Sequence, residues 1–232
     1  MGYLTVFILS LSSLAYEVLL PRIFSFTQWH HLSFLVISVV VFGFGASGSL
    51  LAMREAAFLR RPASGAGLGA LGLLYALSAA GSCLFLLRVP LDYFLLPVQF
   101  RQAGYLAATY LVLLAPFFFA GAALSLCFAA HPEHSGWIYA SSMLGSACGA
   151  AAPALLLPRF GEVRLVFAGA ALAALAGTLA PLAPGGRRPL RILIALGCLL
   201  AASPLAWIAL SSRPCLELKP SPYKTLAQAL QF

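Results

Sequence analysis

Seven apolar runs, each close to 20 residues long, follow one another along this chain of 232 residues. A helix needs about 20 apolar residues to cross the hydrocarbon core of a bilayer, so each run has the length of one membrane span. The first run has no basic segment before it and no clear cleavage site, which favours a retained helix over a signal peptide. The expected spans are residues 3–22, 31–53, 65–87, 104–130, 138–157, 163–182 and 192–210.

The charged residues are too few to cover a water-facing surface. They make up 9% of the chain, whereas soluble domains carry about 25%. We therefore predict an all-α, polytopic integral membrane helical bundle of about seven transmembrane helices over residues 1–211, and a half-transporter-like arrangement stays open. The lipid bilayer is its expected surrounding. Since the basic residues lie in gaps between apolar runs and form no stripe, we expect no nucleic-acid partner.

The same basic residues bear on orientation. With seven spans, six of the 14 lysines and arginines fall on the side of the N-terminus and the remaining eight on the side of the C-terminus. Basic residues accumulate on the cytoplasmic side of membrane proteins. The small excess favours a cytoplasmic C-terminus.

A glycine pattern in the second run resembles a nucleotide-binding loop. The stretch FGFGASGSLLA contains G-x-G-x-x-G at Gly43, Gly45 and Gly48. A dinucleotide loop follows a strand, opens a helix and has an acidic residue about 20 positions later. This stretch lies inside an apolar run, and no acid follows at that distance. We therefore expect no cofactor, and we interpret the three glycines as helix-packing residues.

A second small-residue pattern supports the packing interpretation. Gly145 and Gly149 form G-x-x-x-G in the fifth run, and three serines lie beside them, namely Ser141, Ser142 and Ser146. Small residues let helix backbones approach closely in lipid. A compact bundle with small-residue seams is the expected result.

Glu17 is the only one of six acidic residues that falls well inside an apolar run. An ionised carboxylate in hydrocarbon costs several kcal/mol unless it is paired, hydrated or protonated. Two interpretations stay open. In the functional one, Glu17 is a proton or cation site near the membrane face, and Tyr16 and Arg22 tune it. In the structural one, Glu17 pairs with Arg22 across a helix break at Pro21, or caps another helix.

Other reactive residues give weaker signals. His131 and His134 form H-x-x-H, but a metal site needs a third ligand, and Glu133 is the only candidate nearby, so we expect no metal. The five cysteines are far apart and form no C-x-x-C, which favours small buried apolar side chains. The sequence contains no Ser-His-Asp pattern, P-loop or paired carboxylates, and we assign no catalytic residue.

Several stretches together resemble one family. The segment SSLAYEVLLPRIFS, with Tyr16, Glu17 and Arg22, resembles the first helix of bacterial membrane-bound spermidine-synthase-like proteins, in which a synthase is fused to a half-transporter of the major facilitator type. GFGASGSLLA resembles the glycine-rich second helix of that family. YASSMLGSACGAAAPALLLPRFG and SPYKTLAQAL resemble a later helix and the junction before the catalytic domain.

The resemblance implies a membrane module in the bacterial inner (plasma) membrane that precedes an aminopropyltransferase domain. That domain would transfer an aminopropyl group from decarboxylated S-adenosylmethionine to putrescine. Residues 212–232 are polar and proline-rich, and we interpret them as a linker toward such a domain, which these 232 residues do not contain.

Three functions remain open at this point. The first is a module that anchors the synthase-like domain and handles polyamines, with that domain fused or associated. The second is an independent small transporter or half-transporter for a cationic solute, acting as a homo-oligomer. The third is a structural membrane subunit. The reading frame beyond Phe232 would discriminate among them, because a catalytic domain there favours the first.

Overall fold

The computed structural model describes residues 2–27, 33–53, 65–89, 100–179 and 188–211. Within these ranges the chain forms seven long α-helices, one short 3-10 helix and no strand. The helices are α1 (Gly2–Thr27), α2 (Ser33–Met53), α4 (Gly65–Arg88), α5 (Phe100–Ala130), η3 (Pro132–His134), α6 (Ser135–Phe160), α7 (Glu162–Leu179) and α8 (Arg188–Leu210). All seven α-helices are long and apolar enough to cross a membrane. The predicted all-α bundle of a multi-pass membrane protein is confirmed.

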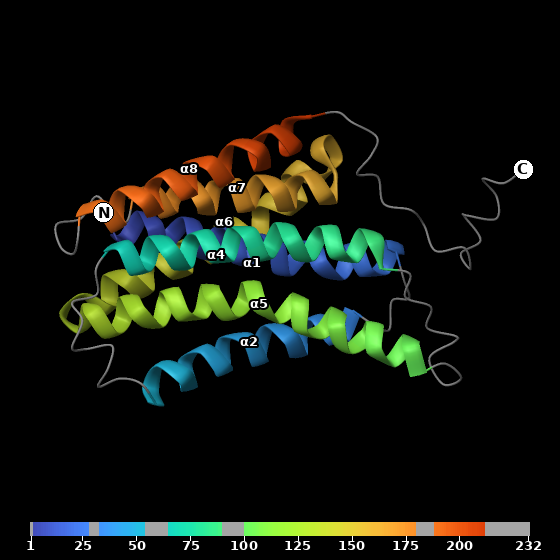
Figure 1. Cartoon of the computed structure of the whole chain (residues 1–232), viewed down its shortest axis with the longest axis horizontal. Coiled ribbons are helices and arrows are strands. Elements are labelled where there is room, and N and C mark those ends of the chain that lie inside the picture. Colours follow the sequence, from blue (N-terminus) through green and yellow to red (C-terminus); the bar gives the residue numbers. More distant parts are fainter. Residues whose placement is uncertain (1, 28–32, 54–64, 90–99, 180–187, 212–232) are drawn as a thin grey trace, which may run out of the picture.

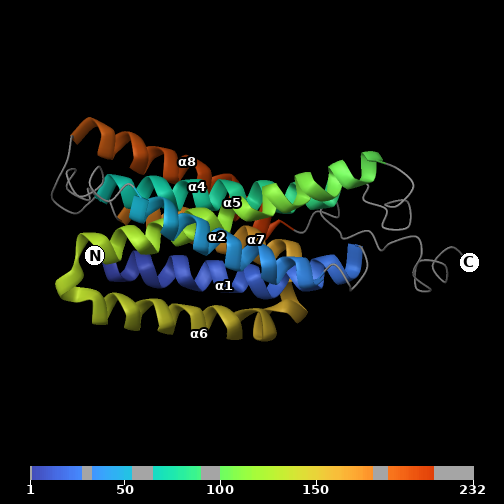
Figure 2. The same ribbon diagram turned by 90° about the horizontal axis from the view of Figure 1, so that it is seen from below.

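The helices run alternately up and down, and α1 occupies the centre of the bundle (Figure 1). It packs against α6 and α7 along most of its length and also contacts α2, α5 and α4. The outer helices have fewer neighbours, since α2 packs mainly on α5, and α8 packs on α7 and α4. Figure 2 shows α1 between α2 and α6. The first apolar run of the sequence is therefore the axis around which the others assemble.

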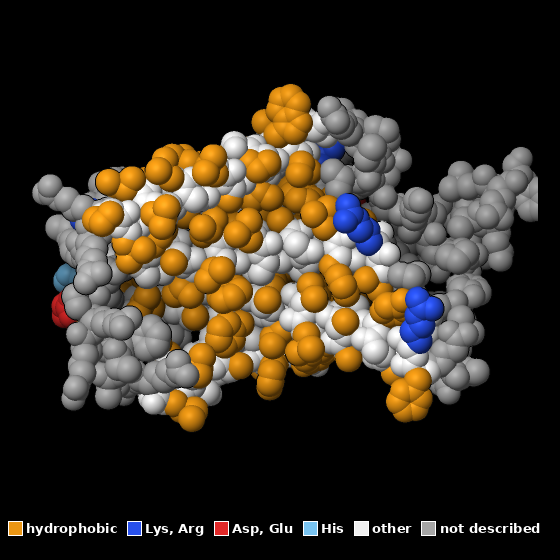
Figure 3. All heavy atoms as spheres, in the orientation of Figure 1, with side chains coloured by type: hydrophobic (Ala, Val, Ile, Leu, Met, Phe, Trp, Pro, Cys, Tyr) orange, Lys and Arg blue, Asp and Glu red, His pale blue; other side chains and the backbone are white. Residues whose placement is uncertain are grey.

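The face of the bundle in Figure 3 is apolar over its middle, as lipid contact requires. Large apolar side chains such as Leu155, Leu200 and Phe34 are about three-quarters exposed. Charged side chains gather toward the two ends in this view. This distribution is the reverse of that in a soluble protein, where exposed apolar patches are small.

Several helix boundaries differ from the sequence prediction by a few residues, and two of the differences have a clear physical cause. We predicted that the first span ends at residue 22, but α1 continues through Pro21 to Thr27. Membrane helices tolerate proline because the freed backbone groups find other partners. The expected spans also left residues 158–162 between two helices, whereas α6 extends to Phe160 and Gly161 alone separates it from α7. Gly161 has a φ of 73°, which only glycine adopts readily.

The closest seam in the bundle joins α6 to α1 through Gly145 and Gly149. A Cβ atom at Gly145 would overlap the backbone of Phe7, and one at Gly149 would overlap the backbone of Leu11. The two helices thus touch backbone to backbone, which is possible only without side chains at these positions.

The glycines of α2 behave differently from one another. A Cβ at Gly43 would lie 2.8 Å from the Cβ of Phe117 on α5, so this glycine sits in the α2–α5 seam. No atom lies within 4 Å of a Cβ added at Gly45 or Gly48. Gly121 of α5 completes the seam, because its Cβ would meet Phe44 of α2. The close approach that we predicted for the whole G-x-G-x-x-G stretch occurs at its first glycine.

Several sequence predictions fall outside the described residues. They concern the tail 212–232 and residues 90–99, the middle of a stretch from 88 to 101 that the sequence suggests as a short interfacial helix. They also concern Trp29, whose place near a span end is typical of an interfacial anchor, and the adjacent His30 and His31. The orientation of the bundle also stays a prediction, although five described arginines lie at helix ends on the side where α1 ends. These are Arg22, Arg88, Arg101, Arg159 and Arg164.

Candidate binding cavity beside Glu17

One side of α1 is hydrogen-bonded to α4 through buried hydroxyl groups. The hydroxyl of Tyr16 lies 2.7 Å from that of Ser82, and Ser82 itself donates to the carbonyl oxygen of Ala79 at 2.9 Å. Since Ser82 uses its single proton there, Tyr16 is the donor to Ser82. One turn earlier, Ser12 and Tyr75 share a hydrogen bond of 3.0 Å. Both tyrosines thus have their hydroxyl groups satisfied inside the bundle.

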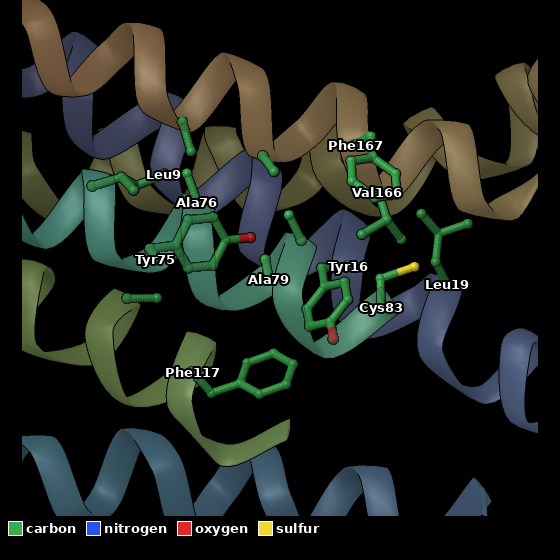
Figure 4. Packing of buried hydrophobic residues seen from close by; sticks show 14 of the residues in the cluster. Leu9, Tyr16, Leu19, Tyr75, Ala76, Ala79, Cys83, Phe117, Val166 and Phe167 are labelled. Carbon is green, nitrogen blue, oxygen red and sulfur yellow. The ribbon is translucent and has the colours of Figure 1, made fainter. Parts of the chain in front are cut away.

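Tyr16 is packed as a core residue. Only 2% of it is exposed, and its ring stacks on Phe117 with 5.6 Å between centroids. Figure 4 shows Tyr16 and Tyr75 among the buried side chains of this cluster. The structure therefore assigns Tyr16 a place in the packing of α1 against α4 and α5, and it does not line the cavity that contains Glu17.

A cavity of about 200 Å³ lies on another side of α1, where α1 meets α2, α5 and α6. Part of its wall is apolar and includes Leu14, Phe44, Leu124 and Met143. The rest is polar. The polar groups come from α1 and α6 and are Ser10, Ser13, Glu17, Ser142 and Ser146. A mixed polar and apolar cavity of this kind is typical of a site for a small organic molecule.

Glu17 is partly buried in the wall of this cavity. At a rise of 1.5 Å per residue, it lies about 22 Å along α1 from Gly2 and about 15 Å from Thr27. This places the carboxyl group inside the span, about 8 Å along the helix axis from Arg22. Within the described part of the chain, no hydrogen bond or ion pair joins it to another residue.

Arg22 does not supply the missing partner. It is exposed, and no ion pair joins it to Glu17, although the structure describes both residues. We considered such a pair on the assumption that Pro21 breaks the helix. Because α1 remains helical, five residues of separation turn the two side chains about 140° apart. Of the three residues predicted to act together, the structure puts only Glu17 at the cavity.

Ser13 is a second polar group without a partner. It is 5% exposed, lines the cavity, and has no hydrogen bond to any residue that the structure describes. Buried hydroxyl groups are bonded in the great majority of cases. The neighbouring Ser10 does follow that rule, since it shares a hydrogen bond of 3.0 Å with Ser142. An open acceptor next to an unpaired carboxyl group indicates a place for a ligand or water.

Pro21 adds a further unusual feature beside the cavity. Proline has no backbone N–H, so the carbonyl of Glu17, four residues earlier, lacks its usual α-helical donor. Transporters use such proline positions at their binding sites. The backbone and the side chain of Glu17 are therefore both unusual at this depth.

The serines of α1 are the site residues that we did not single out from the sequence. Ser10, Ser13 and Glu17 are spaced i, i+3 and i+7, which places them on one face of a helix. That spacing is the signal that could have identified them. Ser142 and Ser146 were recognised only as neighbours of the packing glycines.

His131 and His134, where α5 connects to α6, do not form a second site. The Nδ1 atom of His131 lies 3.5 Å from a carboxylate oxygen of Glu133, and the two side chains are 60% and 59% exposed. Among the described residues, no group of three or more His, Cys, Asp or Glu side chains is placed to hold a metal. The four cysteines in the described part of the chain are free thiols: Cys83, Cys127 and Cys198 are buried, whereas Cys148 is exposed.

No family model, curated protein or solved structure matches this chain. The resemblance to spermidine-synthase-like proteins therefore stays a prediction from the sequence motifs.

Proposed function

We propose that this chain is a membrane module that binds an organic ammonium ion, with the carboxylate of Glu17 as its counter-ion. The observation that carries the proposal is the unpaired carboxyl group of Glu17 in a cavity deep within the span. Acidic residues at such depth pair with a partner, face a water-filled cavity or mark a substrate pathway.

The groups around the cavity suit an ammonium ion. An ammonium group donates three hydrogen bonds and accepts none. Glu17 offers two carboxylate oxygens, and the hydroxyl oxygens of Ser13 and Ser146 lie in the same wall without hydrogen bonds to other described residues. Charge attraction is much stronger at this depth than in water, because the effective dielectric constant is lower.

A divalent metal ion suits the cavity less well. Calcium takes six to eight oxygen ligands, and such sites use several carboxylates. The described residues bring a single carboxylate to this cavity. A volume of about 200 Å³ is also larger than a bare ion needs and has room for a short aliphatic chain.

The sequence resemblance supports an amine as ligand. It implies that the module anchors an aminopropyltransferase domain in the bacterial inner membrane and handles its polyamines. A site for an ammonium group fits that role, and it equally fits the alternative of a transporter for a cationic solute. The carboxylate of Glu17 has the same task in both.

Titration of the protein in lipid nanodiscs with hexylamine tests the proposal. We expect saturable binding to the unmodified chain, measured by calorimetry, and at least tenfold weaker binding to Glu17→Gln, because a hydrogen bond to a charged group contributes about 1.5–3 kcal/mol. Glu133→Gln is the matched control, since Glu133 is an exposed acid far from the cavity. Equal binding to the folded Glu17→Gln variant, or none to the unmodified chain, would refute the proposal.

A further inference from the structure

The cavity lies halfway along the helices and not at an end of the bundle. Its lining residues belong to the interiors of four helices, such as residue 44 of Ser33–Met53 and residues 142, 143 and 146 of Ser135–Phe160. No described residue of a helix end or connection lines it. The cavity therefore has no described wall that faces the water at either end of the bundle.

The two flanking helices leave α1 accessible from the side. Both α2 and α6 are peripheral: α2 packs mainly on α5, α6 mainly on α1, and they share no extensive interface with each other. Figure 2 shows α1 running between them. Met143, on the α6 side of the cavity, is 47% exposed, so the cavity reaches the surface there. At this depth that surface faces the hydrocarbon of the bilayer.

The deep part of the cavity combines polar groups with the buried apolar Leu9 and Ala120, and its opening carries the apolar Met143. Ser13 and Ser142, at 5% and 4% exposure, lie deep. Phe44 and Leu124 are partly buried, and Met143 is half exposed. A ligand that enters between α2 and α6 would meet the exposed Met143 at the opening. The partly buried carboxylate of Glu17 and the buried Ser13 lie further along the wall.

We infer that the ligand is an amphiphilic monoamine, a single ammonium group on an alkyl or acyl chain, that enters from the bilayer between α2 and α6. The inference rests on the proposed ammonium site and names its ligand class. The ammonium group pairs with Glu17 and Ser13. The chain passes over Met143 into the hydrocarbon, where each buried CH₂ group favours binding.

A diamine is a poorer ligand for this geometry. The wall offers one carboxylate among the described residues, so the second ammonium group would be left at the apolar opening. An unpaired charge in such a place is costly. The geometry thus selects against the short polyamines that the sequence resemblance implies.

A chain-length series tests the inference in lipid nanodiscs. The probes are propylamine, hexylamine and dodecylamine, with 1,6-diaminohexane as the matched diamine. Binding that persists in Glu17→Gln is subtracted, which removes simple partition into the lipid. We expect the Glu17-dependent affinity to rise by up to about fourfold for each added CH₂ until the chain leaves the groove, and the diamine to bind at least tenfold more weakly than hexylamine.

A substitution at the opening provides the second arm. We expect Met143→Trp to weaken dodecylamine binding at least tenfold, because the indole would obstruct the opening. Leu144→Trp is the control, since Leu144 is 62% exposed on α6 and does not line the cavity. It should leave binding within twofold.

The outcomes separate the two proposals. If diaminohexane binds as tightly as hexylamine in a Glu17-dependent manner, or if affinity does not change with chain length, the proposed ammonium site stands and the amphiphile is wrong. Equal effects of Met143→Trp and Leu144→Trp also overturn entry between α2 and α6. If no probe shows Glu17-dependent binding to the folded protein, the ammonium site itself is wrong.

Discussion

The two sides of α1 place adjacent residues in opposite situations. Toward α4, the hydroxyl groups of Ser12 and Tyr16 are both hydrogen-bonded across the helix interface. Toward the cavity, Ser13 and Glu17 have no such partners among the described residues. Each step along a helix turns the side chain by about 100°, so neighbours in sequence face different surroundings.

The comparison separates what holds the bundle together from what is left open for a ligand. A buried polar group with its partner stabilises one arrangement of helices, whereas a buried polar group without one destabilises the empty protein. Substitutions on the first side should therefore cost stability and leave ligand binding unchanged. Substitutions on the second side should weaken ligand binding and should not lower stability.

The largest expected effect lies at the seam that brings α6 and its serines to the cavity. Gly149→Ala places a methyl group against the backbone of Leu11, and we expect destabilisation of about 3 kcal/mol, as for severe overpacking. Thermal unfolding in detergent measures it. Gly45→Ala is the control, because its Cβ would meet no atom within 4 Å, and alanine is the better helix former by up to about 1 kcal/mol. Equal destabilisation by the two variants would contradict the seam.

The next largest effect is expected on the side of α1 that is hydrogen-bonded to α4. Tyr16→Phe removes the donor to Ser82, and we expect a loss of about 1 kcal/mol in stability, within the range for single hydrogen bonds between membrane helices. Hexylamine binding should stay within twofold of the unmodified chain. A tenfold loss of binding would show that Tyr16 serves the site and would remove the distinction between the two sides.

The smallest effects come from two adjacent serines and sharpen the comparison most. Ser12→Ala should lower stability by about 0.5–1 kcal/mol, because Tyr75 loses its partner. Ser13→Ala should leave stability unchanged or slightly raised, since its hydroxyl group is buried without a partner, and should weaken hexylamine binding about threefold. Denaturation gives the stability of each variant, and calorimetry gives the hexylamine affinity of each. If Ser12→Ala and Ser13→Ala changed stability and hexylamine affinity by the same amounts, the two serines would not have the different roles assigned to them.

The sequence predicted the number of helices well because the length of an apolar run reflects the local thickness of the membrane. It predicted helix ends less well: α1 continues past Pro21, since lipid gives the chain no alternative to a helix. Glycine spacing pointed to the seams but did not identify which of Gly43, Gly45 and Gly48 faces α5. That depends on the rotation of α2 in the bundle.

The candidate site was only partly predictable. Glu17 stood out because a carboxyl group in an apolar run is costly wherever its helix lies. Its surroundings depend on contacts between residues more than 100 positions apart, such as that between Ser10 and Ser142. The pairing with Arg22 that we considered requires a helix break that does not occur.

Labelling of Glu17 by a carbodiimide in nanodiscs tests the central claim most directly. A lipid-soluble reagent, dicyclohexylcarbodiimide, should modify Glu17 from the bilayer. Saturating N,N-dimethylhexylamine, a tertiary amine that carbodiimide cannot couple to a carboxyl group, should protect it, while a water-soluble carbodiimide should modify Glu133 and leave Glu17 intact. Peptide mass spectrometry reads both sites. A Glu17 that the lipid-soluble reagent never modifies, or that the tertiary amine fails to protect, would contradict an open ammonium site in the membrane.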